Sequence, residues 1–340
     1  MTLPAADHAD RATARLEWAR RASGATSLQL HRASMDAGFR SYWRGASNDG
    51  SPTAASVIVM DSPPDREDVR PWLRIREVLE RGGVRVPRVL AQDVDAGFLL
   101  LEDLGAETYL HVIDTDNADA LLDDAVSQLL KLQAIACPAD LPSYDEALLA
   151  RELHLFDQWY LGHHLGLTLD PADRQTLERV YRHLIDAALA QPRVLVHRDF
   201  MPRNLMPAAA GPAVLDFQDA VRGPIAYDPI SLFKDAFLSW PEPRVAAWLA
   251  RYHARASEAG LPVPELARFR RDADLMGVQR HLKIIGIFAR LRHRDAKPKY
   301  LADVPRFIGY LDAVLPRYPE LAALAELIDR HVRPALAADA

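Results

Sequence analysis

The chain of 340 residues has one cysteine, Cys137, and no long apolar run, and these absences exclude whole classes of protein. No disulfide can form within the chain, and we expect Cys137 to be a small buried side chain. No apolar run approaches the ~18–20 residues of a membrane-spanning helix, and the first residues lack the basic flank and apolar core of a signal peptide. The net charge of −6 gives no electrostatic basis for binding nucleic acid. We therefore expect a cytoplasmic protein that binds neither membranes nor nucleic acid, and no feature implies a protein partner.

The composition is that of an ordinary globular protein, and the length suggests two packing units. Residues 5–22 have the pattern of an amphipathic helix. Pro71 opens a second helix, with Asp68 as a possible cap, and Gly82 and Gly83 end it. Runs of β-branched and aromatic residues between turn residues predict five strands, at 28–32, 39–45, 55–61, 86–93 and 97–105.

From about residue 116 the pattern is mostly helical. Apolar residues recur at helical spacing, with breaks at Pro and Gly, over 116–136, 144–164, 171–189, 229–256, 264–293 and 304–337. The only strand-like segments in this part are RVLVH (193–197) and AVLDF (213–217), which we expect to form a hairpin-like pair. The pattern predicts a small sheet-and-helix lobe, a short connector at 102–105 and a larger helical lobe.

The strand-like segments RVLVH and AVLDF each deliver an aspartate, and the spacing of these residues matches that of kinases. HRDFMPRN (197–204) fits the catalytic loop H-R-D-x-x-x-x-N, and Asp216-Phe217 supplies the first two letters of D-F-G. Phosphoryl transfer needs a carboxylate that orients and deprotonates the attacking hydroxyl, and oxygen ligands for Mg²⁺ beside the phosphates. Chance would produce such a set at a frequency on the order of 10⁻⁴ per chain. The motif therefore indicates a kinase.

The motif assigns a role to each of its polar residues. Asp199 is predicted to be the catalytic base that holds the acceptor hydroxyl. Asn204 and Asp216 are predicted to bind Mg²⁺ and, through it, the nucleotide. His197 is expected to brace the loop by hydrogen bonding rather than to do chemistry.

The first lobe lacks the lysine with which protein kinases hold the phosphates. No lysine occurs in the first 130 residues, there is no G-x-G-x-x-G, and the first turn reads MDAG at 35–38. Arg40 and Arg44 share one face of a strand at period two and are the candidates to replace that lysine, with a solvated edge arginine as the alternative. Arg198 and Arg203 could meet phosphate or substrate, or could equally be surface arginines.

The connector would bind adenine through the backbone of Glu102 and Leu104, unless it is a plain hinge. Residues 1–104 are accordingly predicted to be an N-terminal nucleotide-binding lobe, and residues 105–340 a C-terminal catalytic and substrate lobe. The next helix begins at YDP (227–229), with Asp228 as its N-cap, only eleven positions after the aspartate of D-F. This leaves no room for an activation loop, and no A-P-E follows, so a small-molecule substrate is favoured.

The chain resembles the aminoglycoside-phosphotransferase-like small-molecule kinases. Within them it is most similar to the bacterial kinases of cell-wall recycling that phosphorylate the anomeric hydroxyl of N-acetylmuramate and N-acetylglucosamine. The stretches that carry the resemblance lie between residues 36 and 307: DAGFRSYWR, VIVMDSPPDREDVRPW, GVRVPRVLAQD, GFLLLEDLGAETYL, VHRDFMPRNLM, VLDFQDAVRGPIAYDPISLFKDAF and VQRHLKIIGIFARLRHRDAKPKYLADVPRF.

The resemblance implies an α+β, two-lobed protein-kinase-like fold, with a small antiparallel-sheet N-lobe and a larger, mostly helical C-lobe. It also implies ATP with Mg²⁺ as the donor, and sugar 1-phosphates as products for peptidoglycan recycling. One departure is local: the turn reads MDAG where a Ser is expected beside the Ala. That departure concerns the contacts to phosphate.

The lactyl carboxylate of N-acetylmuramate is expected to pair with a cation of the protein. The candidates are Lys234, Arg280, Lys283 and Arg290, and for each of them a solvated surface charge is the alternative. Two other functions are open. One is a kinase of the same fold that acts on an aminoglycoside, choline or homoserine, although cationic acceptors call for acids near the base and only Asp219 and Asp235 are close in sequence. The other is a nucleotide-binding scaffold without turnover, suggested by the missing lysine.

Overall fold

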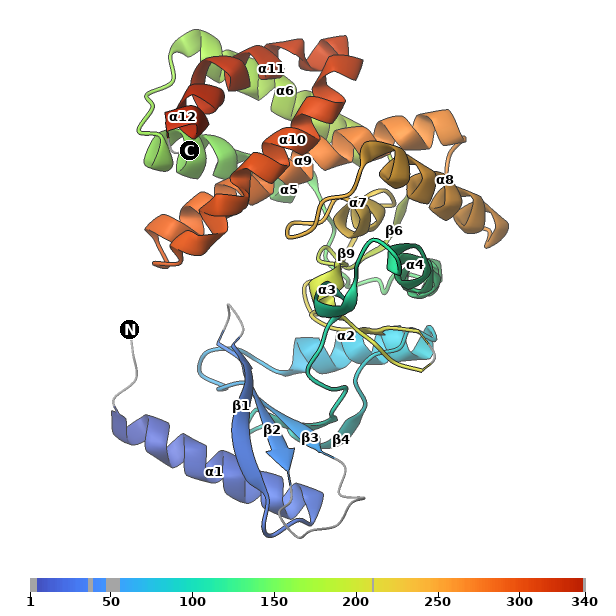
Figure 1. The fold of residues 1–340 in the computed structure, drawn as a ribbon. Coiled ribbons are helices and arrows are strands. Elements are labelled where there is room, and N and C mark those ends of the chain that lie inside the picture. The colour runs from blue at the N-terminus through green and yellow to red at the C-terminus, as the bar shows by residue number, and fades with distance from the viewer. Residues whose placement is uncertain (1–4, 36–38, 47–55, 210, 339–340) are drawn as a thin grey trace. The chain divides into compact units, whose positions relative to one another are not determined.

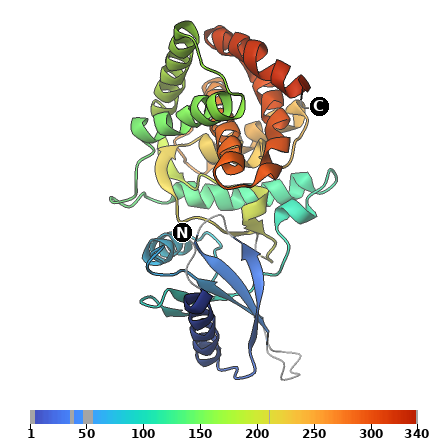
Figure 2. The same cartoon turned by 90° about the vertical axis from the view of Figure 1, so that its left-hand side faces the viewer.

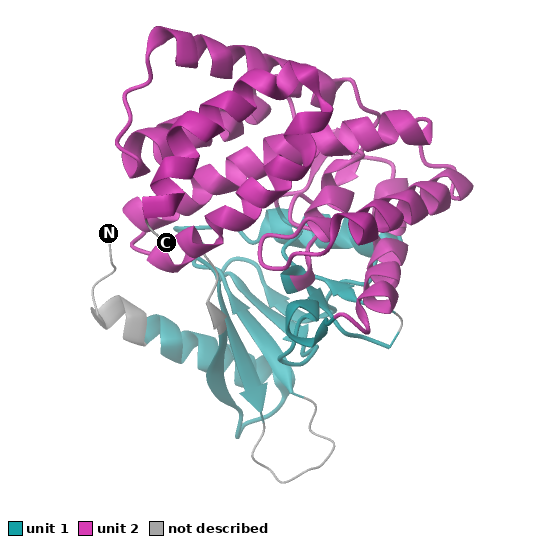
Figure 3. Ribbon diagram, turned by 45° about the horizontal axis from the view of Figure 1, so that its top comes forward, with its two compact units in different colours: residues 1–114, 203–218 teal, residues 115–202, 219–340 magenta. Residues whose placement is uncertain are grey.

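The computed structural model describes residues 5–35, 39–46, 56–209 and 211–338. Its contacts group into two units (Figure 3), and each is described separately. Unit 1 comprises residues 1–114 and 203–218, and unit 2 comprises residues 115–202 and 219–340. The predicted boundary between nucleotide-binding and catalytic lobes, at 104/105, concerns function and stays a prediction. The predicted turn at 36–38 lies outside the described residues.

Unit 1 is built on a five-stranded sheet (Figure 1) in the order β1-β2-β3-β5-β4, in which every neighbouring pair is antiparallel. The strands are β1 (Gln29–Met35), β2 (Ser41–Ala46), β3 (Val57–Asp61), β4 (Val89–Asp93) and β5 (Phe98–Glu102). All five predicted strands are present, with ends shifted by a few residues. Antiparallel neighbours need only short connections, as between β4 and β5, whereas β3 and β4, which are not neighbours, are joined by a segment that contains a helix, Arg70–Arg81.

Helix α1 (Ala5–Ser23) packs against the sheet of unit 1. Trp18 is buried in one apolar cluster with Val59, Phe98 and other strand residues. The Arg15 guanidinium lies 3.7 Å from the centre of the Trp43 ring and 2.7 Å from the carboxylate of Asp61. The predicted amphipathic helix thus places its apolar stripe and an arginine against the same sheet.

Helix α2 (Arg70–Arg81) holds the hairpin at residues 203–218 within unit 1. The Asp68 carboxylate accepts a hydrogen bond from the N–H of Arg70 (3.0 Å), so Asp68 does bind the helix start. Trp72 on α2 lies against Phe217, with ring centres 5.1 Å apart. The N–H of Val214 donates to the carbonyl of Arg85 (2.8 Å), which ties the hairpin to the segment after α2.

The predicted pairing of segments 193–197 and 213–217 is wrong. Strand β6 (Arg193–Val196) pairs with β9 (Val221–Pro224) in unit 2, and β7 (Leu205–Met206) pairs with β8 (Ala213–Val214) in unit 1. Strand β9 reads VRGP, with the Gly and Pro that usually mark a turn, and β7 is only the two residues LM, so neither has the sequence pattern of a strand. The sequence therefore did not predict β9, the partner of β6, or β7, the partner of β8.

Unit 2 is mostly helical, and α9 runs through its interior (Figure 2). Its α-helices are α4 (Ala118–Ala134), α5 (Glu146–Leu155), α6 (Pro171–Leu189), α7 (Tyr227–Phe233), α8 (Glu242–Glu258), α9 (Leu266–His293), α10 (Val304–Val314), α11 (Ala322–Leu327) and α12 (Arg333–Ala338), while the short α3 (Tyr109–Val112) belongs to unit 1. Most residues of α9 between Phe269 and Ala289 are buried. A Cβ on Gly286 would lie 2.3 Å from the backbone of Leu155, so glycine is needed where α9 meets α5.

Several predicted helices are divided in the structure. The segment 144–164 changes from α5 to a π-helix at Phe156–His164, and 229–256 is broken between α7 and α8, just before Pro241. Among the described residues, no helix combines the length and apolar character needed to cross a lipid bilayer. Cys137 is only half-buried, less than expected.

Candidate functional site

The loop after β6 carries His197, Arg198 and Asp199, and Asp228 holds its backbone. One carboxylate oxygen of Asp228 accepts from the N–H of His197 (2.7 Å), and the other accepts from the N–H of Arg198 (3.0 Å). Arg198 has φ = +77°, a left-handed conformation that costs a non-glycine residue about 1–2 kcal/mol. The two hydrogen bonds that Asp228 accepts offset that cost and so fix the direction in which the Asp199 side chain leaves the loop.

The prediction that Asp228 caps helix α7 is therefore wrong. The N-cap of α7 is Ala226, and Asp228 lies inside the first turn with its side chain directed at the β6 loop. Burial raises the pKa of Asp228 to about 6, although the nearby His197 and the two N–H groups act in the opposite direction. The sequence pattern Asp-Pro fits a cap and gives no sign of a loop thirty residues earlier.

His197 braces the loop as expected. Its Nδ1 accepts a hydrogen bond from the N–H of Asp199 (3.2 Å), and its ring stands edge-on to Phe200 with centres 5.8 Å apart. The side chain is fully buried. Because Nδ1 accepts a hydrogen bond, any single proton of a neutral ring must be on Nε2.

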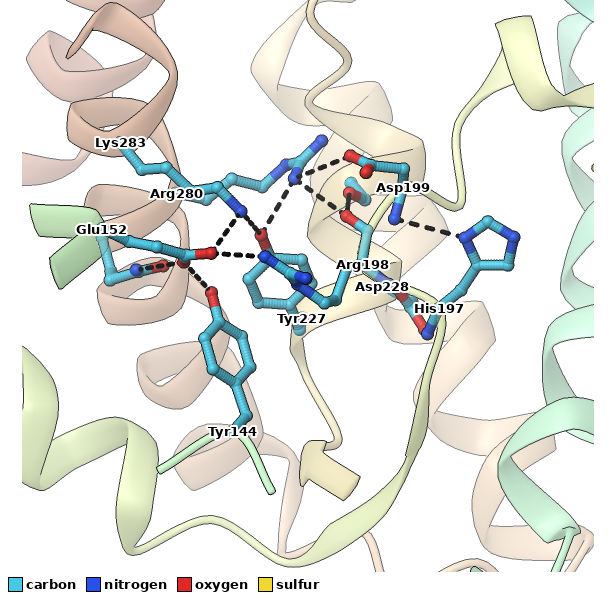
Figure 4. A network of polar contacts seen from close by, with 11 residues as sticks. Tyr144, Glu152, His197, Arg198, Asp199, Tyr227, Asp228, Arg280 and Lys283 are labelled. Carbon is cyan, nitrogen blue, oxygen red and sulfur yellow. Dashed lines mark hydrogen bonds and ion pairs between the residues drawn. The ribbon is translucent and has the colours of Figure 1, made fainter. Parts of the chain in front are cut away.

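Beside this loop, Glu152 of α5 is the centre of a buried network (Figure 4). Its carboxylate accepts from the Tyr144 hydroxyl, from Arg198 Nη2 (2.6 Å) and from Lys283 Nζ (2.9 Å). Gln279 on α9 adds a fourth contact at 3.3 Å. Burial raises the pKa of Glu152, but the charges of Lys283 and Arg198 outweigh it and lower that pKa to about 2. Arg198 is therefore committed to a buried ion pair and is not a surface arginine.

Sequence reasoning missed Glu152 and Tyr144. The signal that exists is weak: Glu152 falls between Leu149 and Phe156 on the apolar stripe of α5, where a carboxylate needs a buried partner. Identifying that partner requires knowing that α9 crosses α5, which the local sequence does not say.

The side chain of Asp199 lies beside Arg280 of α9 (Figure 4). Arg280 Nη1 donates to the carbonyl of Arg198 and to the Tyr227 hydroxyl (both 3.1 Å), and lies 3.9 Å from Asp199 Oδ1. Lys283 Nζ also donates to the Tyr227 hydroxyl (3.0 Å). Burial raises the pKa of Asp199, but the charges of Arg280 and Lys283 outweigh it, so the pKa lies below its ordinary value. Asp199 is thus a carboxylate at neutral pH, with 44% of its side chain exposed.

Asn204 and Asp216 are brought together in unit 1 by the β7–β8 hairpin. The N–H of Leu215 donates to the carbonyl of Asn204 (2.9 Å), so Asn204 lies opposite the residue before Asp216. Asp216 has φ = +62°, and its carboxylate accepts a hydrogen bond from Gln218 (2.9 Å). Arg203, which precedes Asn204, is exposed. An amide oxygen and a carboxylate at adjacent strand ends are a donor set that fits Mg²⁺.

The two candidate phosphate-binding arginines of unit 1 are both ion-paired. Arg44 binds both carboxylate oxygens of Asp103 (2.6 and 3.0 Å) and the carbonyl of Gly105 (2.6 Å). Arg40 is buried and lies 3.0 Å from the Glu67 carboxylate. Arg44 therefore ties β2 to the connector that follows β5.

In the connector, Glu102 makes hydrogen bonds through both its backbone and its side chain. Its N–H donates to the carbonyl of Arg88 (3.0 Å), so this N–H is already hydrogen-bonded within unit 1. Its carboxylate binds Arg85 and Arg88; burial raises the pKa of Glu102, but these arginines lower it to about 2. Leu104, two residues on, is half-buried.

Comparison with known proteins agrees with this arrangement. Residues 29–270 match the model of the phosphotransferase enzyme family. The N-acetylmuramate/N-acetylglucosamine kinase of Pseudomonas putida is 56% identical over 302 residues, which is 88% of this chain and 87% of that protein. The N-acetylmuramate/N-acetylglucosamine kinase of Neisseria meningitidis is 45% identical over 301 residues, covering 87% and 88%.

Solved structures show the same fold at low sequence identity. Choline kinase LicA from Streptococcus pneumoniae superposes with a TM-score of 0.60 at 12% identity, over 87% of this chain and 98% of that one. ADP-bound aminoglycoside phosphotransferase APH(2'')-Ib superposes with a TM-score of 0.57 at 18% identity, over 86% and 96%. The predicted α+β, protein-kinase-like fold is confirmed. Fold, motif and relatives together lead to one conclusion: the chain belongs to the phosphotransferase enzyme family and is a kinase.

Proposed function

We propose that this kinase transfers the γ-phosphoryl group of ATP to the anomeric (C1) hydroxyl of N-acetylmuramate and N-acetylglucosamine, giving sugar 1-phosphates for peptidoglycan recycling. The relatives named for these two sugars cover nearly nine tenths of the chain. The observation that carries the chemistry is Asp199, a carboxylate that Asp228 positions through the loop backbone. Because ATP is the donor, we place the reaction in the cytoplasm.

The low pKa of Asp199 suits an anomeric acceptor. Arg280 and Lys283 keep Asp199 ionised, so it is ready to accept a proton at neutral pH but is a weak base. An anomeric hydroxyl is more acidic than an ordinary alcohol. In a loose transition state its proton leaves late, when the oxygen is already bonding to phosphorus, so a weak base suffices.

The nucleotide side of the reaction is assigned to unit 1. Family membership implies ATP, and we propose that Asn204 and Asp216 hold Mg²⁺, which would neutralise charge on the phosphates. Among the described residues no group of three or more His, Cys, Asp or Glu could hold a metal ion alone. Phosphate and water oxygens would therefore complete the coordination, as is usual for Mg²⁺. Arg40 or Arg44 would contact phosphate, and the backbone of Glu102 and Leu104 would contact adenine.

The charges near the base argue against the alternative of a kinase that acts on a cationic alcohol. Arg280 and Lys283 place two cations beside Asp199, and a cationic aminoglycoside or choline would be repelled by them. A scaffold without turnover does not account for an ionised Asp199 held in the catalytic loop.

The test is ADP release with N-acetylmuramate, N-acetylglucosamine, glucose, kanamycin and choline as acceptors. We expect turnover with the two amino sugars, and none with the methyl glycoside of N-acetylglucosamine, in which C1 is blocked. Phosphorus–proton NMR of the product should show a 1-phosphate. A methyl glycoside that still accepts phosphate, with a 6-phosphate formed from the free sugar, would overturn the anomeric assignment.

A further inference from the structure

Arg280 stands out among the buried cations of unit 2 because much of its hydrogen-bonding capacity is unused. It is 1% exposed, and its Nη1 makes all the hydrogen bonds described above. Its Nε and Nη2 have no hydrogen-bond partner among the described residues. Lys283 and Lys234 differ, because each lies within 2.9 Å of a carboxylate, on Glu152 and Glu242 respectively. Buried donors without partners are rare in native proteins and call for an explanation such as a ligand.

Asp235 has the converse feature, a buried acceptor oxygen for which the described residues provide no donor. It is fully buried at the end of α7, and its Oδ1 accepts from the N–H groups of Phe237 (2.7 Å) and Leu238 (2.9 Å). Its Oδ2 has no partner within the described part of the chain. The Tyr310 hydroxyl donates to the backbone carbonyl of Asp235 (3.1 Å), and the Tyr310 ring stacks on His281, the residue after Arg280 on α9, with ring centres 4.9 Å apart. Asp235 and Arg280 therefore lie in the same part of unit 2. No ion pair between them is found among the described residues, so donors and acceptor are both left over.

We infer that Arg280 and Asp235 form the subsite that binds the acceptor sugar beside Asp199. This inference rests on the proposed function and names two residues that would select the substrate. Arg280 donates to an oxygen next to C1, either the ring oxygen or the 2-acetamido carbonyl, and Asp235 accepts from a ring hydroxyl. A sugar ring carries both an acceptor oxygen near C1 and further hydroxyl groups. A monohydric alcohol such as choline carries only its one hydroxyl, with no second oxygen beside it.

The position of Arg280 decides which part of the sugar it meets. Its Nη1 lies 3.9 Å from Asp199 Oδ1, so a hydroxyl bound to Asp199 brings the neighbouring sugar atoms to the guanidinium. The lactyl group of N-acetylmuramate is on C3, which C2 separates from the carbon that carries the reacting hydroxyl. Arg280 therefore recognises what the two amino sugars share, and its loss should affect both to the same extent.

The experiment compares Arg280→Lys and Asp235→Asn with the wild type in steady-state kinetics. Both variants should raise the KM for N-acetylglucosamine by ~10–100-fold, the usual worth of a hydrogen bond to a charged group. The KM for N-acetylmuramate should rise by the same factor, while the KM for ATP changes less than about twofold. Arg268→Lys is the matched control: it makes the same exchange at the start of α9, where Arg268 pairs with Asp272 on the same helix (2.8 Å), and should leave both sugar KM values unchanged.

A cycle with altered sugars separates binding from folding. The sugars to compare are 3-deoxy-, 4-deoxy- and 6-deoxy-N-acetylglucosamine. For one of them, the KM with the wild type should rise by the same factor as the KM of Asp235→Asn rises with the complete sugar. Combining that sugar with that variant should cost no further loss beyond about twofold, because the same contact is removed twice. A general loss of structure would instead lower activity toward every sugar in proportion.

The outcomes are distinct. A wild type that releases no ADP with either amino sugar overturns the proposed function, and this inference with it. A wild type that is active, with sugar KM values unchanged in both variants or with additive losses for every deoxy sugar, overturns the subsite alone. A rise confined to N-acetylmuramate would assign Arg280 to the lactyl group instead and would also contradict the inference.

Discussion

An arginine–carboxylate pair in unit 1 and a network of ion pairs in unit 2 differ in how far water reaches them. In unit 1, Arg44 donates to the carboxylate of Asp103 through Nε and Nη2, yet a third of the arginine side chain is exposed. In unit 2, Glu152 binds Arg198 and Lys283, and none of the three is more than 20% exposed. Solvated pairs contribute about 0–1 kcal/mol to stability, whereas removing one partner of a buried pair costs several. The first arrangement ties segments together, and the second sets the charge around Asp199.

Equal pKa values do not mean equal contributions in the two units. Glu102 in unit 1 and Glu152 in unit 2 both have a pKa lowered to about 2. One of the two arginines that hold Glu102, Arg88, is 68% exposed, so water screens much of its attraction. Around Glu152 the charges are desolvated and mutually dependent, and we expect the site to be less tolerant of change there.

The largest effect should come from the base itself. Asp199→Asn is expected to lower turnover by at least ~10²–10⁴, the usual worth of a positioned base, while ATP affinity changes only a few-fold. Single-turnover kinetics and nucleotide binding measure the two quantities. Near-normal turnover in this variant would show that Asp199 is not the base.

Breaking the buried network should produce the largest loss of stability. Glu152→Gln leaves Arg198 and Lys283 buried without a countercharge, and we expect the free energy of unfolding to fall by ~3–5 kcal/mol. Asp123→Asn is the control, because Asp123 pairs with Arg255 (2.7 Å) at the surface, and its loss should cost no more than about 1 kcal/mol. Equal losses in urea unfolding would contradict the contrast between buried and solvated pairs.

Asp228 and Glu152 should give stability opposite dependences on pH. Asp228 has a folded pKa of about 6 against an ordinary 3.8, so the folded state holds its proton longer and stability falls as pH rises from ~4 to ~6, by about 3 kcal/mol. The lowered pKa of Glu152 contributes stability that is present above ~4.5 and is lost as pH falls toward 2.

Unfolding of Asp228→Asn in urea at pH 4 to 7 measures the first of these terms. The difference in unfolding free energy between wild type and variant should change across this interval, because only the wild type carries the Asp228 carboxyl that titrates there. A constant difference would show that the pKa of Asp228 is not raised.

The metal ligands proposed in unit 1 should have a smaller effect. Asn204→Ala and Asp216→Ala are each expected to raise the Mg²⁺ concentration for half-maximal activity by ~10-fold or more, since each removes an oxygen ligand. Titration of activity with Mg²⁺ at fixed ATP measures this. Unchanged titrations in both variants would mean that the metal is held elsewhere.

The smallest effect is expected at the phosphate-binding arginines. At least one of Arg40→Ala and Arg44→Ala should bind ATP a few-fold more weakly while binding adenosine as the wild type does, because only ATP carries phosphate. Calorimetry with the two ligands compares them. Equal losses for ATP and adenosine would indicate that the arginine only supports the sheet, through Glu67 or Asp103.

The predicted elements were confirmed where the signal was local. The five strands of the sheet and helix α6 follow the pattern of apolar residues, and Asp170 caps α6 through the N–H of Asp173 (2.8 Å) directly before Pro171. The pairing of β6 was predicted wrongly, because its partner β9 carries no pattern of its own. The roles of Asp199, Asn204 and Asp216 stay predictions that the experiments above test.

The sequence by itself determined the order and spacing of the residues proposed to carry the chemistry, because the motif and its neighbouring aspartate occupy twenty consecutive positions that can be compared without a fold. Only the tertiary structure decided what surrounds Asp199. The residue before it, Arg198, is contacted by Asp228 from thirty residues away, by Glu152 from nearly fifty and by Arg280 from more than eighty. Charge acts through space rather than along the chain, so the groups that set the pKa of Asp199 and complete its site become evident only when α5, α7 and α9 are packed together.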